Sequence, residues 1–351
     1  MDNIRLKVPV IPAAFFGMVL GLAGLGSAWR TAHQVWQLPE VVGEAIMLAA
    51  TIVWVLLVIL YALKWIAARD AALAEVSHPV QCCFVGLAGV ATMLVAGGAV
   101  PYSRLIALVV FLVGCAFTLC FAIWRTGGLW FGERDQSSTT AVLYLPAVAG
   151  SFVAGTVAAA FGHADWGQFA FGAGLFSWLA IESVLLNRLL TGPTLASALR
   201  PTLGIQLAPA PVGAVALLSV APNESSLFAH AMIGYGLLQG LVLLRLLPWI
   251  MQEPFAPSYW AFTFGATALS TALLRLLGHG EGGAIGVVAP IVFILVNLVV
   301  ILVAAGTVRR AAQGRLIAAP IAVQTGLMNH ARKHIIRNDG VGGSNPSCGT
   351  S

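Results

Sequence analysis

Charged residues are scarce in this chain of 351 residues. Asp, Glu, Lys and Arg make up only 9% of it, whereas hydrophobic residues make up 59% and the mean hydropathy is +0.91. A soluble globular domain carries about 25% charged residues. The composition therefore excludes a soluble protein and predicts an integral membrane protein with many spanning segments.

Residue groups that could carry chemistry are also missing. Four of the five cysteines lie in apolar runs, where cysteine behaves as a small hydrophobe, so no disulfide framework is expected. His330 and His334 have the spacing of a metal pair but stand in a basic tail without a third ligand. The apolar segments contain no Ser-His-Asp set, phosphate loop or paired carboxylates. We therefore expect no enzyme, no metal, no cofactor and no nucleic-acid partner.

Ten apolar segments are long enough to cross a bilayer, which takes about 20 residues. They cover residues 8–28, 42–67, 80–99, 105–124, 140–161, 166–190, 203–220, 227–251, 258–277 and 284–308. The first continues beyond the length of a signal-peptide core, so we expect it to remain as a spanning helix. The domain expectation is an all-α membrane domain over 1–312, a basic amphipathic cytoplasmic segment on lipid over 313–337, and a disordered tail over 338–351.

The distribution of basic residues predicts the orientation of the chain. An even number of spans puts both termini on one side, and all but three of the 18 Lys and Arg residues fall there. The three exceptions are Arg30, Arg104 and Arg275. Because basic residues concentrate on the cytoplasmic side of membrane proteins, both termini are expected in the cytoplasm.

The odd-numbered segments differ from the even-numbered ones. They contain prolines and glycines, among them Pro12, Gly17, Pro146, Pro209 and Gly265, and carry no ionisable side chain between their ends. Such residues bend helices, and a bend at membrane depth is tolerated only against protein or a water-filled cavity. The chain is therefore expected to form helical hairpins, with five bent, uncharged helices lining a pore and five straighter ones outside.

Phe264 is the residue expected to close that pore. It stands directly before Gly265 in the ninth segment, which opens Tyr-Trp-Ala-Phe-Thr-Phe-Gly. A ring beside a bend in the backbone can project into a cavity. The alternative is a ring that faces lipid or packs between helices, beside a glycine that serves only close packing.

Several strings resemble the tellurite-resistance and dicarboxylate transporter family, in particular its bacterial TehA branch, a family that also includes the slow anion channels of plant guard cells. Their order and spacing match from residue 8 to residue 308. The strings are Ile11-Pro12, Phe15–Gly17, His78–Val80, Thr92–Val95, Tyr144–Ala149, Phe171–Gly174, Leu207–Ala210, Leu244–Trp249 and Trp260–Gly265.

The resemblance implies a homotrimer in a bacterial inner membrane, with a separate pore in each protomer. It further implies ten helices in five hairpins around a quasi-fivefold axis, with the odd-numbered helices lining the pore. The family's occluding phenylalanine falls on Phe264 rather than on Phe262. Plant relatives carry proline at the next position, where this chain has Gly265.

A passive anion channel is the function we expect. A pore without fixed charge cannot hold an anion tightly, so selection comes from the cost of dehydration and from the weak positive potential of helix ends. Easily dehydrated monovalent anions such as chloride, nitrate and iodide are the expected permeant ions. Phe264 would close the pore, and Phe16 and Phe152 are further wall positions.

The alternative is a proton-coupled carrier for malate or another C4-dicarboxylate, or a tellurite-resistance exporter. A carrier needs buried titratable groups and a cation that faces the carboxylates. Glu182 and Arg245 could supply them, but both lie on even-numbered segments. A structural ion pair between two outer helices is therefore the simpler expectation for these two residues.

Overall fold

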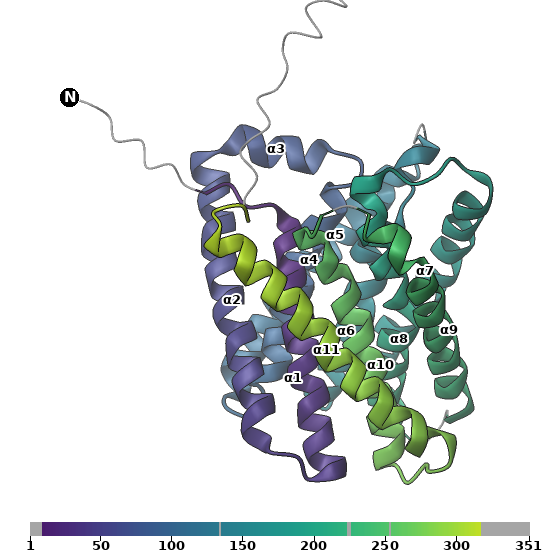
Figure 1. Cartoon of the computed structure of the whole chain (residues 1–351). Helices are drawn as coiled ribbons and strands as arrows, with labels where there is room; N and C mark the ends of the chain where they lie inside the picture. The colour runs from purple at the N-terminus through teal and green to yellow at the C-terminus, as the bar shows by residue number, and fades with distance from the viewer. Residues whose placement is uncertain (1–8, 133–134, 223–225, 253, 317–351) are drawn as a thin grey trace, which may run out of the picture. The chain divides into compact units, whose positions relative to one another are not determined.

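A computed structural model of the chain describes residues 9–132, 135–222, 226–252 and 254–316, all in one unit that ends at Leu316. Every regular element in these ranges is helical, and ten spans are long and apolar enough to cross a membrane. The spans follow the ten expected segments closely (Figure 1). The expected tail segments lie outside the described residues, apart from 313–316.

Five spans form an inner ring. Each of these helices contacts the next, and the last contacts the first, which closes the ring. The helices are α1 (Phe16–Trp36), α4 (Cys82–Ala99), α6 (Gly150–Ala160), α8 (Pro209–Val220) and α10 (Ala261–Gly278). Four of them are preceded by 3-10 or π-helical segments. The 3-10 helices are η1 (Ala13–Phe15), η3 (Ala141–Leu143), η5 (Ser197–Leu207) and η6 (Pro257–Trp260), and the π-helix is η4 (Leu145–Ala149).

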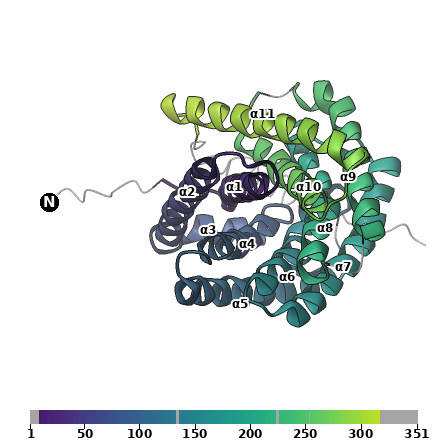
Figure 2. The same ribbon diagram turned by 90° about the horizontal axis from the view of Figure 1, so that it is seen from below.

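The other five spans surround this ring, as Figure 2 shows. They are α2 (Glu40–Ala67), α5 (Arg104–Leu129), α7 (Ala164–Thr191), α9 (Ser226–Ile250) and α11 (Ala284–Ala312). Each packs against the inner helix that precedes it, which makes five hairpins. In the inner spans 67–83% of the most apolar stretch is buried, against 22–33% in the outer spans. The expected two layers are therefore confirmed.

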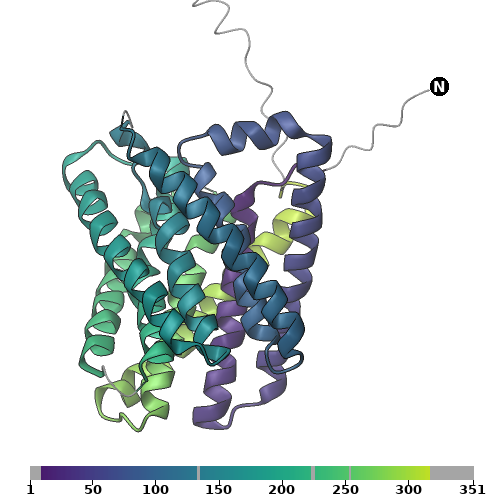
Figure 3. The ribbon, with the colours of Figure 1, turned by 180° about the vertical axis from the view of Figure 1, so that it is seen from behind.

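The five inner helices all run in the same direction, because an outer helix returns the chain after each of them (Figures 1 and 3). We call the end of the ring where they begin the N-terminal mouth, and the end where they finish the C-terminal mouth. A short helix that hydropathy did not predict, α3 (Arg69–Ser77), lies at the N-terminal mouth. It is too short and too polar to cross a membrane.

α1 is longer than expected. It continues past residue 28 to Trp36, about two turns further. The polar residues of this extension find partners inside the protein, since Arg30 pairs with Glu44 at 2.6 Å and His33 Nδ1 lies 2.7 Å from the carbonyl oxygen of Leu38. Polar composition alone had suggested a loop there.

Candidate functional site

A small cavity of about 60 Å³ lies inside the inner ring. All five inner spans contribute to its wall, and the described residues that line it all belong to them. They include Gly17 and Leu20, Phe84 and Leu87, Leu145 and Phe152, Ile205 and Pro209, and Trp260 and Phe264. None of the described lining residues carries a carboxylate, an ammonium or a guanidinium group. The wall is therefore apolar and without fixed charge.

The exposure of α1 along its cavity-facing side shows where the passage closes. Residues three or four apart lie on one face of a helix. On this face Gly17 is partly exposed, Leu20 and Gly24 are buried, and Ser27 and Thr31 are partly exposed again. Because the outer ring covers the inner helices, we attribute the partial exposure on this face to the interior passage. The passage is thus open at both ends of α1 and closed between them.

α10 repeats this pattern. Ala261 and Phe264 are partly exposed, Ala268 and Thr271 are buried, and Arg275 is partly exposed. The span formed by η5 and α8 shows the same pattern, because a buried Val212 lies between Ala208 and Val215, which are both partly exposed. A closed layer of buried residues therefore lies about halfway along these three helices, with partly exposed residues toward each mouth.

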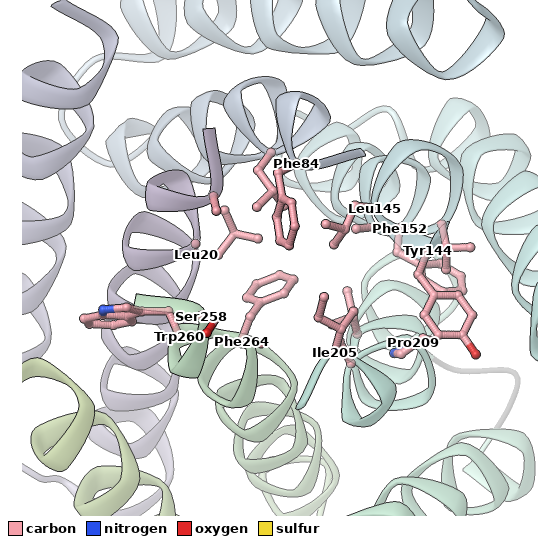
Figure 4. A pocket seen from close by; sticks show the side chains of 18 of the residues that line it. Leu20, Phe84, Tyr144, Leu145, Phe152, Ile205, Pro209, Ser258, Trp260 and Phe264 are labelled. Carbon is pink, nitrogen blue, oxygen red and sulfur yellow. The ribbon is translucent and has the colours of Figure 1, made fainter. Parts of the chain in front are cut away.

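Phe264 projects into the cavity on the N-terminal side of the closed layer. Figure 4 shows its ring directed toward Phe84, with Leu20 on one side and Ile205 on the other. Phe84 is a second ring in the passage that sequence reasoning missed. A Cβ added at Gly24 would lie 2.2 Å from Oγ1 of Thr267 and 3.4 Å from Cδ2 of Phe264, so this glycine lets α1 approach α10 closely beside the ring.

Gly265 permits close packing and not the expected bend. α10 is a continuous helix from Ala261 to Gly278, so the helix is not interrupted at this glycine. A Cβ on Gly265 would lie 2.7 Å from the amide nitrogen of Ala208 and 2.7 Å from the carbonyl carbon of Leu207. Real Cβ atoms essentially never come that close to backbone. The glycine therefore brings α10 against the junction of η5 and α8.

Gly265→Ala should lower the free energy of unfolding by about 1–3 kcal/mol, because the added methyl group forces two backbones apart. Gly234→Ala is the matched control. Gly234 is exposed in the middle of α9 with nothing within 4 Å of an added Cβ, so alanine there should stabilise the helix by up to about 1 kcal/mol. Thermal unfolding in detergent, followed by size-exclusion chromatography, measures both. Equal stability of the two variants would contradict the close-packing account.

The other wall positions proposed from the sequence fall into two groups. Gly17, Phe152 and Pro209 line the cavity, and Pro12, Phe16 and Pro146 do not. Phe16 turns toward α2, where its ring meets that of Tyr61 edge-on at a centroid distance of 5.8 Å.

The two prolines outside the wall have other surroundings. Pro12 precedes η1, and its carbonyl oxygen accepts the amide of Phe15 at 3.1 Å. Pro146 lies within η4 and faces a separate recess between α5, α6 and α7. Proline spacing identified the inner helices, but it did not predict which side of a helix each proline occupies.

The expected ion pair between Glu182 and Arg245 is not formed. Arg245 is exposed on α9, and the ion pairs of the described residues do not include it. Glu182 is 8% exposed and accepts hydrogen bonds from Trp178 Nε1 at 2.7 Å and Gln206 Nε2 at 2.6 Å. Neutral donors thus satisfy the buried carboxylate where the sequence suggested a cation.

Two tyrosine hydroxyls complete this network. Tyr144 donates to Glu182 Oε2 at 2.6 Å, and Tyr235 donates to Oε1. The ring of Tyr144 lines the cavity while its hydroxyl points away from it (Figure 4). Glu182 therefore lies behind the cavity wall and ties that wall to α7 and α9.

The C-terminal mouth carries the three arginines that sequence analysis assigned to one side. Arg30 pairs with Glu44 and donates to the carbonyl oxygen of Gly98 at 3.0 Å. Tyr102, in the loop after α4, also donates to Glu44, and this hydrogen bond raises the pKa of the tyrosine hydroxyl. Most of the positive charge of Arg30 is thereby balanced by a neighbouring carboxylate.

Comparison with known proteins covers nearly all of the described chain. Residues 11–308 match the model of a family named SLAC1 and described as voltage-dependent anion channel. The chain is 33% identical over 314 residues, 89% of its own length and 94% of the relative's, to the tellurite resistance protein TehA homolog of Haemophilus influenzae. It is 23% identical over 316 residues, 86% of its length and 59% of the relative's, to the S-type anion channel SLAH2 of Arabidopsis thaliana.

Proposed function

This chain belongs to the SLAC1 family of voltage-dependent anion channels, and we propose that it conducts small monovalent anions passively through a pore that Phe264 closes. It is a multi-pass membrane protein and not an enzyme. The observation that carries the proposal is the position of the Phe264 ring, inside an uncharged cavity and next to a closed layer of the inner ring.

An uncharged wall favours passage over binding. Anions pass the stretch of pore around this cavity because no charged group there holds them, and those that shed water easily pass best. The inner spans begin at the N-terminal mouth, so the partial positive charge of their first amide groups attracts anions there. Chloride, nitrate and iodide are the ions that we propose for this pore.

The setting in the membrane is part of the same proposal. The excess of Lys and Arg around the N-terminal mouth supports a cytoplasmic location for both termini and for this mouth. Large hydrophobic side chains are exposed all along the outer helices, for example Ile59, Val113 and Leu298. Such faces suit contact with lipid and with the other protomers of a homotrimer in a bacterial inner membrane.

The test is a comparison of transport modes in chloride, nitrate, malate and tellurite. A channel gives ohmic currents in bilayers that do not depend on a pH gradient. A proton-coupled carrier gives flux that saturates with malate and follows the pH gradient, and a tellurite exporter carries the oxyanion itself. Saturating, proton-driven flux of malate without ohmic chloride current would overturn the proposal.

Glu182→Gln separates channel from carrier at the residue level. Glutamine has almost the same shape and keeps one acceptor oxygen for the hydrogen bonds of Tyr144 and Trp178. We expect the chloride current per folded protein to stay within about twofold of wild type, because Glu182 lies behind the cavity wall and does not enter the passage. Loss of all transport in a well-folded Glu182→Gln protein would favour the carrier.

A further inference from the structure

Arg275 lies on the pore-facing side of α10, beyond the closed layer. It follows Phe264 by eleven residues, about three turns, so the two side chains leave the helix on the same face roughly 16 Å apart along the axis. Ala268 and Thr271 lie between them on this face and are buried, whereas Arg275 is partly exposed. Arg275 therefore belongs to the space that opens toward the C-terminal mouth.

The guanidinium group of Arg275 reaches across to α8. Its Nη1 donates to the carbonyl oxygen of Val215 at 3.1 Å and to Ser219 Oγ at 2.5 Å. Val215 and Ser219 continue the face of α8 on which Val212 lines the cavity, and both are partly exposed. Figure 2 shows α8 and α10 side by side in the inner ring. The charge thus lies between two inner helices, on the side that faces the passage.

An acidic side chain balances Arg30 at this mouth, but among the described residues none balances Arg275 or Arg104, whose Nη2 donates to the carbonyl oxygen of Phe161 at 2.6 Å. Arg30 has Glu44 at 2.6 Å, whereas no carboxylate of the described residues lies within 4.0 Å of Arg275. The acidic residue Glu281 is occupied by His230 at 3.1 Å and by Ser226 at 2.5 Å. Both acceptors of Arg275 among the described residues are neutral, so no carboxylate there balances its positive charge.

The C-terminal mouth is where an anion needs such a charge. The inner helices finish there, and the carbonyl groups of their last turns carry partial negative charge, which repels anions. Arginine presents several N–H donors in one plane, an arrangement that suits halides and planar oxyanions such as nitrate. We propose that Arg275 forms an anion-binding site in the C-terminal half of the pore, which loads a monovalent inorganic anion before it meets the closed layer.

The test uses Phe264→Ala as the background, since this inference rests on the proposed channel function. In that background Arg275→Gln should lower the chloride current severalfold at about 20 mM salt, where a single charge acts over a long distance. At about 1 M salt, where the Debye length is about 3 Å, the two proteins should conduct alike. Arg275→Lys keeps the charge and should retain most of the current at low salt.

The outcomes separate the two proposals. If Phe264→Ala itself carries no anion current, the channel proposal fails. If Phe264→Ala conducts and Arg275→Gln conducts equally at every salt concentration, only the anion site fails, and Arg275 is then a structural cap for the end of α8. Glu224 lies outside the described residues, so Glu224→Gln is included; a severalfold gain of current would mean that this carboxylate already neutralises Arg275 and would overturn the site.

A chemical version of the test does not depend on how well the glutamine variant folds. In Arg275→Cys, a thiol reagent that adds a quaternary ammonium group from the side of the C-terminal mouth should raise the low-salt current. A reagent of similar size that adds a sulfonate should lower it further. Equal effects of the two reagents, or no reaction from that side, would contradict a pore-facing charge at this position.

Discussion

Phe264→Ala should raise the anion conductance of this channel at least severalfold. The ring of Phe264 lines an apolar cavity of about 60 Å³ and points from α10 toward Phe84 (Figure 4). Alanine removes the ring but keeps the helix, because it is the best helix former. No charge is added or lost, so the change acts through the width of the passage. Current in planar bilayers under chloride and nitrate measures the effect.

Phe262→Ala is the matched control for this prediction. Phe262 lies two residues earlier on α10, and its ring turns away from the cavity to stack on Tyr259 at a centroid distance of 6.2 Å and to pack against Gly204. Its removal deletes the same atoms without widening the passage, so the conductance should remain at the wild-type level. If Phe264→Ala reached the membrane and conducted no more than Phe262→Ala, Phe264 would not be the gate.

The two-layer architecture was predictable because it leaves a strong composition signal. Helices that are surrounded by protein tolerate proline and glycine and carry few charges, and the odd-numbered segments have this composition apart from Arg275 near the end of the ninth. All ten spans were accordingly found to within a few residues, apart from the C-terminal end of α1 and the start of the η5–α8 span. α3 was missed because its sequence, Arg-Asp-Ala-Ala-Leu-Ala-Glu-Val-Ser, is short and polar.

Side-chain partners were much less predictable than the helices. Composition indicates that a glycine matters but not whether it bends a helix or brings two helices together, and Gly265 does the second. Glu182 and Arg245 have opposite charges on neighbouring outer helices, yet Arg245 is exposed and Glu182 turns inward to Tyr144. A sequence gives the charges but not the rotation of each helix about its axis, and this rotation decides which charges meet.

One buried ion pair joins three elements at the N-terminal mouth. Lys64 of α2 donates to Glu75 of α3 at 2.7 Å, and the two side chains are only 4% and 6% exposed. Lys64 also donates to the carbonyl oxygen of Ile11 at 3.0 Å, and Glu75 accepts the amide of Ala13 at 2.8 Å. These contacts anchor the start of the first inner span, so they hold part of the pore wall in place.

Lys64→Met should therefore lower the free energy of unfolding by about 3–5 kcal/mol, because it leaves the carboxylate of Glu75 buried without its cation. Arg30→Met is the comparison within the same protein. The side chains of Arg30 and Glu44 are 20% and 29% exposed. Water can therefore solvate the carboxylate of Glu44 once the arginine is removed. Loss of the Arg30–Glu44 ion pair should lower the free energy of unfolding by about 1 kcal/mol or less. Chemical unfolding in detergent, with tryptophan fluorescence as the signal, measures both.

The double variant Lys64→Met with Glu75→Leu decides whether the unpaired charge is the cause. Replacing both members of a buried pair by apolar side chains of similar volume removes the charge and should recover more than half of the loss. Recovery should stay incomplete, because the amide of Ala13 loses its acceptor and an unsatisfied buried N–H costs about 1–3 kcal/mol. If Lys64→Met cost no more than Arg30→Met, the pair would be accessible to water, and the N-terminal mouth would be held by apolar packing instead.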